Sequence, residues 1–358
     1  MLFTPFDLRG FQLTNRAVMA PLTRQRALEL NTPNSLMATY YAQRASAGLI
    51  ITEGTSPSPN GLGYARMPGL FNEGQRDGWK LVTDAVHEQG GKIVLQVMHT
   101  GRVSHIANLP PGGEVWGPSA EVCPGEMRTD SLGSQPHTPP RAMTSADIST
   151  LIEEHVQTAR LAMAAGFDGI ELHGANGYLI EQFLNPHVNR RTDGYGSNIA
   201  GRNRLLLEIA QATAREIGAE RVGVRLSPYG VVNSTAAFDE VDQQYLALVE
   251  QLSTLGLMYL HVLDHSASGT PPVPETTKSA LRAAFDGPFI LAGGFDKASA
   301  EQALLDGRAD LIAMGRPFLA NPDLVERMRS NAPLNPLDPA TLYVGGAQGY
   351  IDYPALAA

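Results

Sequence analysis

The sequence has only one cysteine, Cys123, among its 358 residues. A single cysteine can form neither an internal disulfide nor a thiolate zinc site nor a cysteine-held iron–sulfur cluster, so we expect none of these. No apolar run approaches the roughly 18 residues that a membrane-spanning helix needs, and we therefore predict no contact with a membrane. The first residues show no basic segment followed by an apolar one, so we expect no secretory signal and a cytoplasmic protein.

Positive charge is also scarce in this chain. Lysine and arginine total 27 against 36 aspartates and glutamates, which gives a formal net charge of −9, and no basic run occurs. This balance argues against nucleic acid as a partner. Hydrophobic residues, by contrast, make up 43% of the chain, which supports a sizeable core.

Short apolar segments alternate with longer amphipathic segments along most of the sequence. The apolar segments read as buried strands, and they cover residues 16–20, 49–52, 92–98, 169–172, 221–226, 258–263, 288–292 and 310–314. The expected helices cover residues 35–47, 73–89, 144–165, 201–217, 239–255, 277–285 and 297–305. Parallel strands need crossover connections of this kind. Eight strand–helix units without a linker predict an α/β fold, a single (β/α)8 TIM barrel, as one domain over residues 1–358.

Two segments fall outside this alternation. Residues 2–4 and 11–13 are expected to pair as an N-terminal hairpin around Gly10. Residues 100–143, after the third strand, are rich in proline, glycine and serine and show little periodicity. A loop of this length is commonly functional or disordered, and we expect a lid-like excursion over the site with a small hairpin of its own.

The fourth expected strand ends in His173-Gly-Ala-Asn176-Gly-Tyr178. Two N–H donors beside one phenol could polarise a carbonyl oxygen and protonate a carbon atom. The alternative is that His173 and Asn176 only satisfy loop backbone, because polar residues at strand ends are common.

Glycines follow the last two expected strands, at Gly293, Gly294 and Gly315, and Arg316 comes next. In a TIM barrel these two loops are the usual place for a phosphate, because glycine lets backbone N–H groups approach an anion. The alternative for both loops is ordinary turn chemistry.

Two further polar residues lie inside expected strands. Gln96 offers both a donor and an acceptor to a ring with adjacent N–H and C=O groups. Arg225 is permanently charged and stands between Val224 and Leu226, where burial is expensive without an anion. The alternative for Arg225 is a structural ion pair with Glu171 or Asp168.

All these strand ends meet at the C-terminal mouth of a barrel. No lysine stands at a strand end, which argues against a Schiff base, and no carboxylate cluster has metal-ligand spacing, so we expect no metal. A phosphate-bearing ring cofactor with an anionic edge fits these residues, and we therefore predict FMN.

Several segments occur together and in a fixed order along the chain. They include Ala20-Pro-Leu-Thr-Arg24, His99-Thr-Gly-Arg102, Trp116-Gly-Pro-Ser-Ala120, His173-Gly-Ala-Asn-Gly-Tyr178, Arg225-Leu-Ser-Pro228, Gly315-Arg-Pro-Phe-Leu-Ala-Asn-Pro-Asp-Leu324 and Gly345-Gly-Ala-Gln-Gly-Tyr350. With these segments the chain resembles the Old Yellow Enzyme family of flavin reductases over nearly its whole length. Thr23 follows Pro21 and Leu22 with no cysteine at that position, which resembles the branch that contains pentaerythritol tetranitrate reductase.

The resemblance implies a role for each matching site residue. The residues implied to bind or line FMN are Pro21, Leu22, Thr23, Gly54, Gln96, Arg225, Gly293, Gly294, Gly315 and Arg316. His173 and Asn176 are implied to bind the substrate oxygen, and Tyr178 to be the proton donor. Tyr64 and Tyr350 are implied to line the substrate cavity. Two positions depart from the family pattern, with Met98 where many relatives have Trp and Gly54 where Ala is usual.

The resemblance also implies an activity, namely reduction of activated C=C bonds with NADPH or NADH as the reductant. Flavin N5 would give hydride to an α,β-unsaturated carbonyl, imide or nitro compound, and Tyr178 would protonate the α-carbon. Phenols are expected as ligands, and the protein is expected to be a monomer or a homodimer. Two alternatives stay open: a flavin-free barrel enzyme acting on a sugar phosphate, and a non-catalytic protein that binds flavin or phenols.

Overall fold

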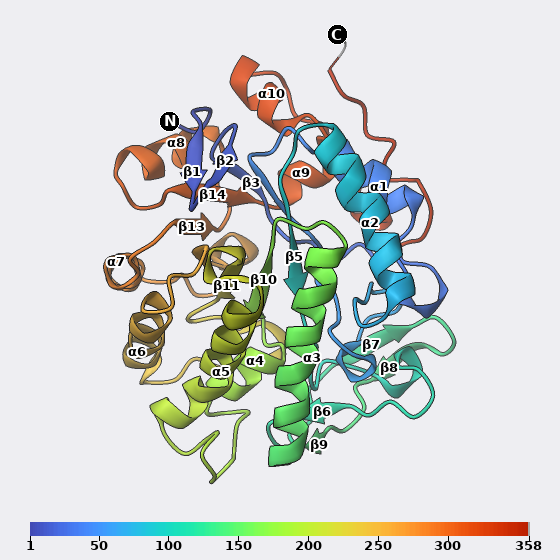
Figure 1. Cartoon of the computed structure of the whole chain (residues 1–358), viewed down its shortest axis with the longest axis vertical. Coiled ribbons are helices and arrows are strands. Elements are labelled where there is room, and N and C mark those ends of the chain that lie inside the picture. The colour runs from blue at the N-terminus through green and yellow to red at the C-terminus, as the bar shows by residue number, and fades with distance from the viewer. Residues whose placement is uncertain (357–358) are drawn as a thin grey trace.

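A computed structural model describes residues 1–356 and shows eight parallel strands that close into a barrel (Figure 1). In order around the barrel the strands are β3 (Ala17–Met19), β4 (Leu49–Ile51), β5 (Ile93–Val97), β10 (Gly169–Gly174), β11 (Val222–Leu226), β12 (Tyr259–Leu263), β13 (Phe289–Ala292) and β14 (Leu311–Met314). β14 pairs with β3 and completes the ring. The predicted (β/α)8 barrel is therefore confirmed.

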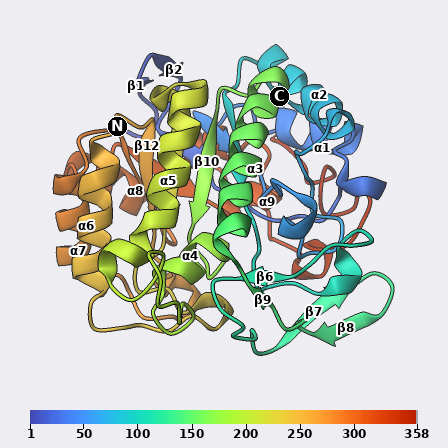
Figure 2. The same cartoon turned by 60° about the horizontal axis from the view of Figure 1, so that its bottom comes forward.

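Helices follow the strands and surround the barrel (Figures 1 and 2). Their bounds are α1 (Ser35–Ala42), α2 (Glu73–Glu88), α3 (Ser145–Ala164), α4 (Leu179–Leu184), α5 (Ile199–Ile217), α6 (Val241–Ser253), α7 (Glu275–Ala284), α8 (Lys297–Leu305), α9 (Arg316–Ala320) and α10 (Leu324–Ser330). The start of α3 is set locally, because Thr144 and Asp147 form a reciprocal capping box. α1 ends at Ala42 and not near residue 47, because irregular turns occupy the residues before β4.

Apolar side chains fill the end of the barrel at which the parallel strands begin. Val18, Leu49, Val94 and Ile290 point inward and are fully buried or nearly so. The hairpin of β1 (Phe6–Leu8) and β2 (Phe11–Leu13) closes this end, and Leu8 packs against the same cluster. Functional groups are therefore confined to the other end of the barrel.

The hairpin is formed, but its first strand is not residues 2–4 as predicted. Arg9 and Gly10 both have left-handed backbones, with φ of 50° and 95°. A two-residue turn of this kind places Leu8 opposite Phe11 and therefore uses residues 6–8. Leu2 is instead buried beside α8, where its N–H donates to Glu301 at 2.8 Å.

The fourth barrel strand is longer than predicted. β10 continues through His173 to Gly174, because Gly174 still pairs with Leu226 of β11. His173 is thus a strand residue whose neighbour across the sheet is Arg225. The register holds the imidazole at a fixed height in the barrel mouth.

Residues 100–143 form an excursion at the end of the barrel opposite the β1–β2 hairpin (Figure 2). It contains the predicted small hairpin, made by β7 (Glu126–Thr129) and β8 (Gly133–Pro136). Near its end, β6 (Trp116–Gly117) pairs in parallel with β9 (Arg141–Ala142). The part of the excursion that carries the hairpin is therefore closed at its base by this pairing.

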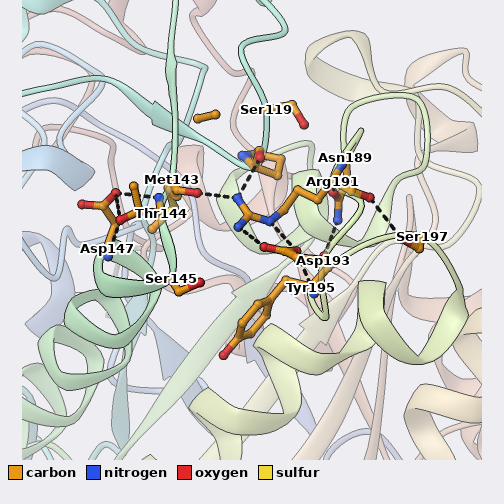
Figure 3. A network of polar contacts seen from close by, with 12 residues as sticks. Ser119, Met143, Thr144, Ser145, Asp147, Asn189, Arg191, Asp193, Tyr195 and Ser197 are labelled. Atoms are coloured by element: carbon orange, nitrogen blue, oxygen red, sulfur yellow. Dashed lines mark hydrogen bonds and ion pairs between the residues drawn. The ribbon is translucent and has the colours of Figure 1, made fainter.

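Arg191, from the loop after α4, connects this excursion to the barrel (Figure 3). Its guanidinium donates to the carbonyl oxygens of Met143 and Pro118, at 2.5 and 3.1 Å. Asp193 accepts two further bonds from the same group, at 2.5 and 3.0 Å. Because the Arg191 side chain is only 10% exposed, these bonds are poorly replaced by water.

We expect Arg191→Gln to loosen the excursion, because the shorter side chain cannot reach both carbonyls and Asp193. Limited proteolysis should cut between residues 116 and 143 faster than in the unmodified protein, and the melting temperature should fall. Arg204→Gln is the matched control, since Arg204 forms an exposed pair with Glu208 within α5. Equal cleavage rates in both variants would contradict the anchoring role of Arg191.

Candidate active site

A cavity of about 520 Å³ opens at the carboxyl ends of the barrel strands. It joins the loops after β3, β10, β12, β13 and β14. Its lining includes these predicted cofactor residues and their neighbours: Pro21, Leu22, Asn176, Arg225, Asp264, His265, Ser268, Gly293, Gly294, Gly315 and Arg316. The structure thus brings together residues from the first, fourth, fifth, sixth, seventh and eighth strands and the loops after them, as the strand-end argument required.

Arg225 supplies a buried positive charge at the inner end of the cavity. The residue is 5% exposed, and its Nε has no hydrogen-bond partner within residues 1–356. The alternative ion pair is not formed: over the described chain, no contact of 4 Å or less joins Arg225 to Glu171 or Asp168, which bind other residues. Burial lowers the pKa of Arg225, and the Glu171 carboxylate opposes that shift. An anionic edge of a bound ring would satisfy this guanidinium.

The loop after β13 shows why glycine is needed at Gly293 and Gly294. A Cβ atom on Gly293 would lie 2.7 Å from the carbonyl oxygen of Asp264, and Gly294 has a left-handed backbone with φ of 73°. On the other side of the cavity, Arg316 donates to the Ser268 hydroxyl at 3.2 Å. Close-packed backbone and an exposed cation at the rim fit a phosphate, so the cavity as a whole fits FMN.

His173 and Asn176 point two donors toward one place. The Ala175 N–H donates to His173 Nδ1 at 3.2 Å, so the neutral imidazole carries its proton on Nε2. Burial, and then the charge of Arg225, hold the pKa of His173 well below its usual range, so the ring is neutral. Nε2 lies 3.4 Å from Asn176 Nδ2. An oxygen atom about 3 Å from each nitrogen, to one side of the line that joins them, would accept from both.

His265, from the loop after β12, sets the orientation of the Asn176 amide. Its Nε2 lies 2.7 Å from Asn176 Oδ1, which makes that oxygen the acceptor and turns Nδ2 toward His173. Our strand-end reasoning did not include His265. Its position two residues beyond the sixth strand is the same signal that selected His173 and Asn176, and it could have found this residue.

Tyr178 stands beside this pair, with its ring 5.1 Å from that of His173 and nearly perpendicular to it. Its hydroxyl lies 2.8 Å from the Tyr64 hydroxyl. Burial raises the pKa of Tyr178, whereas hydrogen bonds to Tyr64 and Asn233 work in the other direction. The phenol therefore keeps its proton near neutral pH while a neighbouring donor steadies its oxygen.

One layer deeper, Gln96 lies in a buried network around Glu171. Gln96 Nε2 donates to one carboxylate oxygen at 2.7 Å, and His261 Nδ1 lies 2.8 Å from the other. Burial opposes ionisation of Glu171, but the charges of His261 and Arg225 outweigh it and the pKa lies below its usual value. The Gln96 amide is thus already oriented by the protein, with its NH2 group on Glu171.

Residues 1–335 match the model of the NADH:flavin oxidoreductase / NADH oxidase family. 12-oxophytodienoate reductase 2 of Arabidopsis thaliana is 38% identical over 359 residues, which cover 99% of this chain and 96% of the relative. A probable flavin mononucleotide-dependent alkene reductase of Leishmania infantum is 39% identical, covering 99% and 97%. The chain belongs to this family.

Solved structures agree with the assignment. Morphinone reductase superimposes with a TM-score of 0.96 at 43% identity, covering 99% of this chain and 96% of that one. An Old Yellow Enzyme homologue from Zymomonas mobilis gives 0.94 at 38% identity, covering 99% of both chains. The resemblance to the Old Yellow Enzyme family is therefore confirmed, and the chain is an Old Yellow Enzyme-like oxidoreductase.

The structure corrects one predicted site residue of this Old Yellow Enzyme-like chain. Tyr350 is fully buried and stacks on Tyr40, with ring centroids 4.0 Å apart, under the guanidinium of Arg24. Its side chain therefore belongs to the core and does not line the cavity. Tyr343, seven residues earlier and 50% exposed, is the tyrosine near the site, because after burial it adds to the raised pKa of both Tyr64 and Tyr178.

The two departures from the family pattern lie in contact with each other. A Cβ atom on Gly54 would lie 2.5 Å from Met98 Cε and 2.6 Å from its Sδ. The smaller residue at position 54 thus leaves room for the end of the Met98 side chain, which packs with Leu62, Met67 and the ring of Tyr64. Both residues are buried, and Thr23, in the loop after β3, is partly exposed.

Within residues 1–356, no group of three or more His, Cys, Asp or Glu side chains is arranged to hold a metal ion. No helix in that range is both long and apolar enough to cross a membrane.

Proposed function

We propose that the chain is an FMN-dependent ene-reductase that reduces activated C=C bonds of α,β-unsaturated aldehydes, ketones, imides and nitro compounds with NADPH or NADH. The observation that carries this proposal is the convergence of His173 Nε2 and Asn176 Nδ2 beside the hydroxyl of Tyr178. The relatives support it: one is a probable alkene reductase, and morphinone reductase has been solved with tetrahydroNAD.

FMN, when bound, supplies the group that takes a hydride from the nicotinamide and passes it to the substrate. The buried charge of Arg225 favours an anionic edge of the ring, and Gln96 and Thr23 would face its other polar edge. Pro21, Leu22 and Gly54 would line the ring. Gly293, Gly294, Gly315 and Arg316 would hold the phosphate.

His173 and Asn176 would activate the substrate. Their two nitrogens are 3.4 Å apart, so the oxygen of an enone can accept from both and lose electron density to them. The double bond conjugated to that oxygen then becomes a better hydride acceptor. Donors held in place beforehand typically contribute about 3–4 kcal/mol each where negative charge develops.

Tyr178 would donate the proton that the substrate carbon needs. Burial keeps the phenol protonated, and the Tyr64 hydroxyl at 2.8 Å can donate to the Tyr178 oxygen as the proton leaves. A positioned general acid typically contributes about 10²–10⁴-fold to such a step.

We infer that the excursion of residues 100–143 belongs to the same single domain and shields this site. It contributes Val103, Cys123 and Met127, which form a buried cluster against which Tyr64 and Tyr178 pack. Excluding water on this side strengthens the hydrogen bonds to the substrate oxygen.

We expect the purified protein to be yellow and to release FMN, and not FAD, on denaturation, because the loops beside Arg316 provide one phosphate site at the cavity. Absorption spectra and chromatography of the released flavin measure this directly. A protein that stays colourless after incubation with FMN would contradict the proposal. A yellow protein that oxidises no NADPH when enones are added would be a flavin- or phenol-binding protein instead.

We expect phenols to bind the oxidised holoenzyme as phenolates and to produce a long-wavelength charge-transfer band, because two donors favour the anion and lower the phenol's apparent pKa. His173→Ala removes one donor and should weaken this binding and slow enone reduction. Spectroscopic titration with a phenol measures the first effect.

His187→Ala is the matched control for this titration. His187 is exposed and contacts the Ala237 carbonyl outside the cavity, so its loss should leave phenol binding unchanged. If His173→Ala behaves like this control, the oxygen-binding role of His173 is wrong.

We expect Tyr178→Phe to slow the oxidative half-reaction with an enone by about 10²–10⁴-fold, because the variant lacks the general acid that protonates the substrate α-carbon. The reductive half-reaction with NADPH needs no proton from this group and should stay within a few fold. Stopped-flow measurement of each half-reaction separates the two effects.

Nitroalkenes provide an internal comparison for the same variant. A nitronate is a stable anion that can leave before it is protonated, so Tyr178→Phe should slow the formation of the nitronate less than it slows enone reduction. Equal slowing of both half-reactions would remove Tyr178 from the mechanism and leave it a packing role at the start of α4.

A further inference from the structure

A buried carboxylate lies directly behind the turn that carries Asn176 and Tyr178. Glu181, on α4, is 3% exposed. One of its oxygens accepts from the backbone N–H of Gly177. The other accepts from the hydroxyls of Ser227 and Tyr245, at 2.8 and 3.0 Å. Glu181 therefore joins the turn to the loop after β11 and to α6.

The Ser227 hydroxyl extends this connection to Asn176. It donates to Glu181 and accepts from the backbone N–H of Asn176 at 2.9 Å. Glu181 thus restrains two successive amides of the turn, Gly177 directly and Asn176 through Ser227. The rest of α4 contributes no other charged group to this contact.

The turn needs such a restraint because its backbone is unusual. Asn176 and Gly177 both have left-handed conformations, with φ of 60° and 71°. A residue with a Cβ atom adopts this region at a cost, and it persists only where surrounding contacts hold it. The Asn176 amide and the start of α4 at Tyr178 both depend on these dihedral angles.

We propose that Glu181 is a positioning residue that holds Asn176 and Tyr178 in their reactive arrangement through Ser227 and Gly177. It touches neither the cavity nor the substrate, and the inference rests on the function proposed above. Its effect should appear where the substrate oxygen and the Tyr178 proton are used, in the oxidative half-reaction.

The protonation state of Glu181 decides how well its carboxyl group restrains the turn. Burial raises its pKa from 4.5 to about 7, although the bonds from Gly177, Ser227 and Tyr245 oppose the shift. Of the side chains that hydrogen-bond to it within residues 1–356, only Tyr245 titrates. Arg202, a cation on α5, is bound to Gln244 and Glu240. Protonation would turn one acceptor oxygen into a donor and break one of the three bonds.

The contribution of Glu181 to stability and the order of the turn depend on pH in opposite directions. The folded protein holds this proton more tightly than the unfolded chain, so the contribution of Glu181 to stability falls as pH rises from about 4.5 to 7. The order of the turn changes in the opposite direction, because only the carboxylate accepts from all three donors. Enone reduction should therefore increase as pH rises through about 7.

The test is the pH profile of the oxidative half-reaction in holoenzyme, with the reductive half-reaction as internal reference. In the unmodified protein the enone rate should rise about tenfold from pH 6 to pH 8, as one group with a pKa near 7 ionises. Glu181→Gln resembles the protonated acid and should keep the low rate at every pH. Tyr245→Phe removes one donor from the carboxylate and should move the midpoint to higher pH.

Tyr195→Phe is the matched control, because Tyr195 donates to Glu208 at 2.8 Å in a tyrosine–glutamate pair that does not touch the turn. Its profile should match that of the unmodified protein. A midpoint that Tyr245→Phe leaves in place, or a Glu181→Gln variant with the normal profile, would overturn the proposal. The first result decides the question even if Glu181→Gln fails to fold.

Amide hydrogen exchange provides a readout that does not depend on turnover. The protection factors of residues 175–178 should fall below pH 7 in the unmodified protein and at all pH values in Glu181→Gln. Unchanged protection in that variant would contradict the positioning role. A protein that reduces no enone at any pH would refute the proposed function, whereas the exchange result would still decide the role of Glu181.

Discussion

The parallel register between β10, β11 and β12 is the constraint on which the site depends. It sets His173 opposite Arg225, and Arg225 opposite His261. His173 and Arg225 face the barrel mouth, whereas the imidazole of His261 lies on Glu171 in the layer below. Side chains alternate along a strand, so Leu172 and Val224 point outward and are buried under the helices. A slip of one residue would exchange these two sets, placing charge under the helices and apolar groups in the mouth. Burial of the outer apolar layer therefore also fixes the position of the polar residues.

Charge inside the barrel is arranged in two layers that differ in how completely the protein satisfies them. In the deeper layer, Glu171 accepts bonds from Gln96 and His261 at 2.7 and 2.8 Å. In the upper layer, Arg225 has a buried nitrogen without a partner in the described chain. Since an unsatisfied buried cation is expensive, the protein leaves a site for an anionic ligand at this height. Because side chains occupy the deeper layer and the β1–β2 hairpin closes the end beyond it, a ligand has room only at the mouth.

The reactive groups themselves stand on a strained turn, and their geometry comes from contacts behind it. Asn176 keeps a left-handed backbone because Ser227 and Glu181 hold the turn from below, while His265 orients its amide from the side. Tyr178 follows two residues later, and the excursion covers it. Arg191 holds that excursion to the barrel by bonding two of its backbone carbonyls. The site is thus assembled from loops, each of which is restrained by a buried polar side chain.

Local pattern was enough to predict eight strands, their order and the cluster of polar groups at the strand ends, because strand length and alternation are properties of neighbouring residues. It misplaced the first hairpin strand, since a two-residue left-handed turn moves the pairing by several positions. The family resemblance implied that Tyr350 lines the cavity, but the structure buries its ring against Tyr40 and leaves Tyr343 half exposed. A match along an irregular loop does not say which side chain turns toward the site. Tertiary structure alone decided the contact between His265 and Asn176, 89 residues apart, and the pair of His261 and Glu171, 90 residues apart. Such contacts form only when the barrel closes and brings distant strand ends to one height, and no short stretch of sequence carries that information.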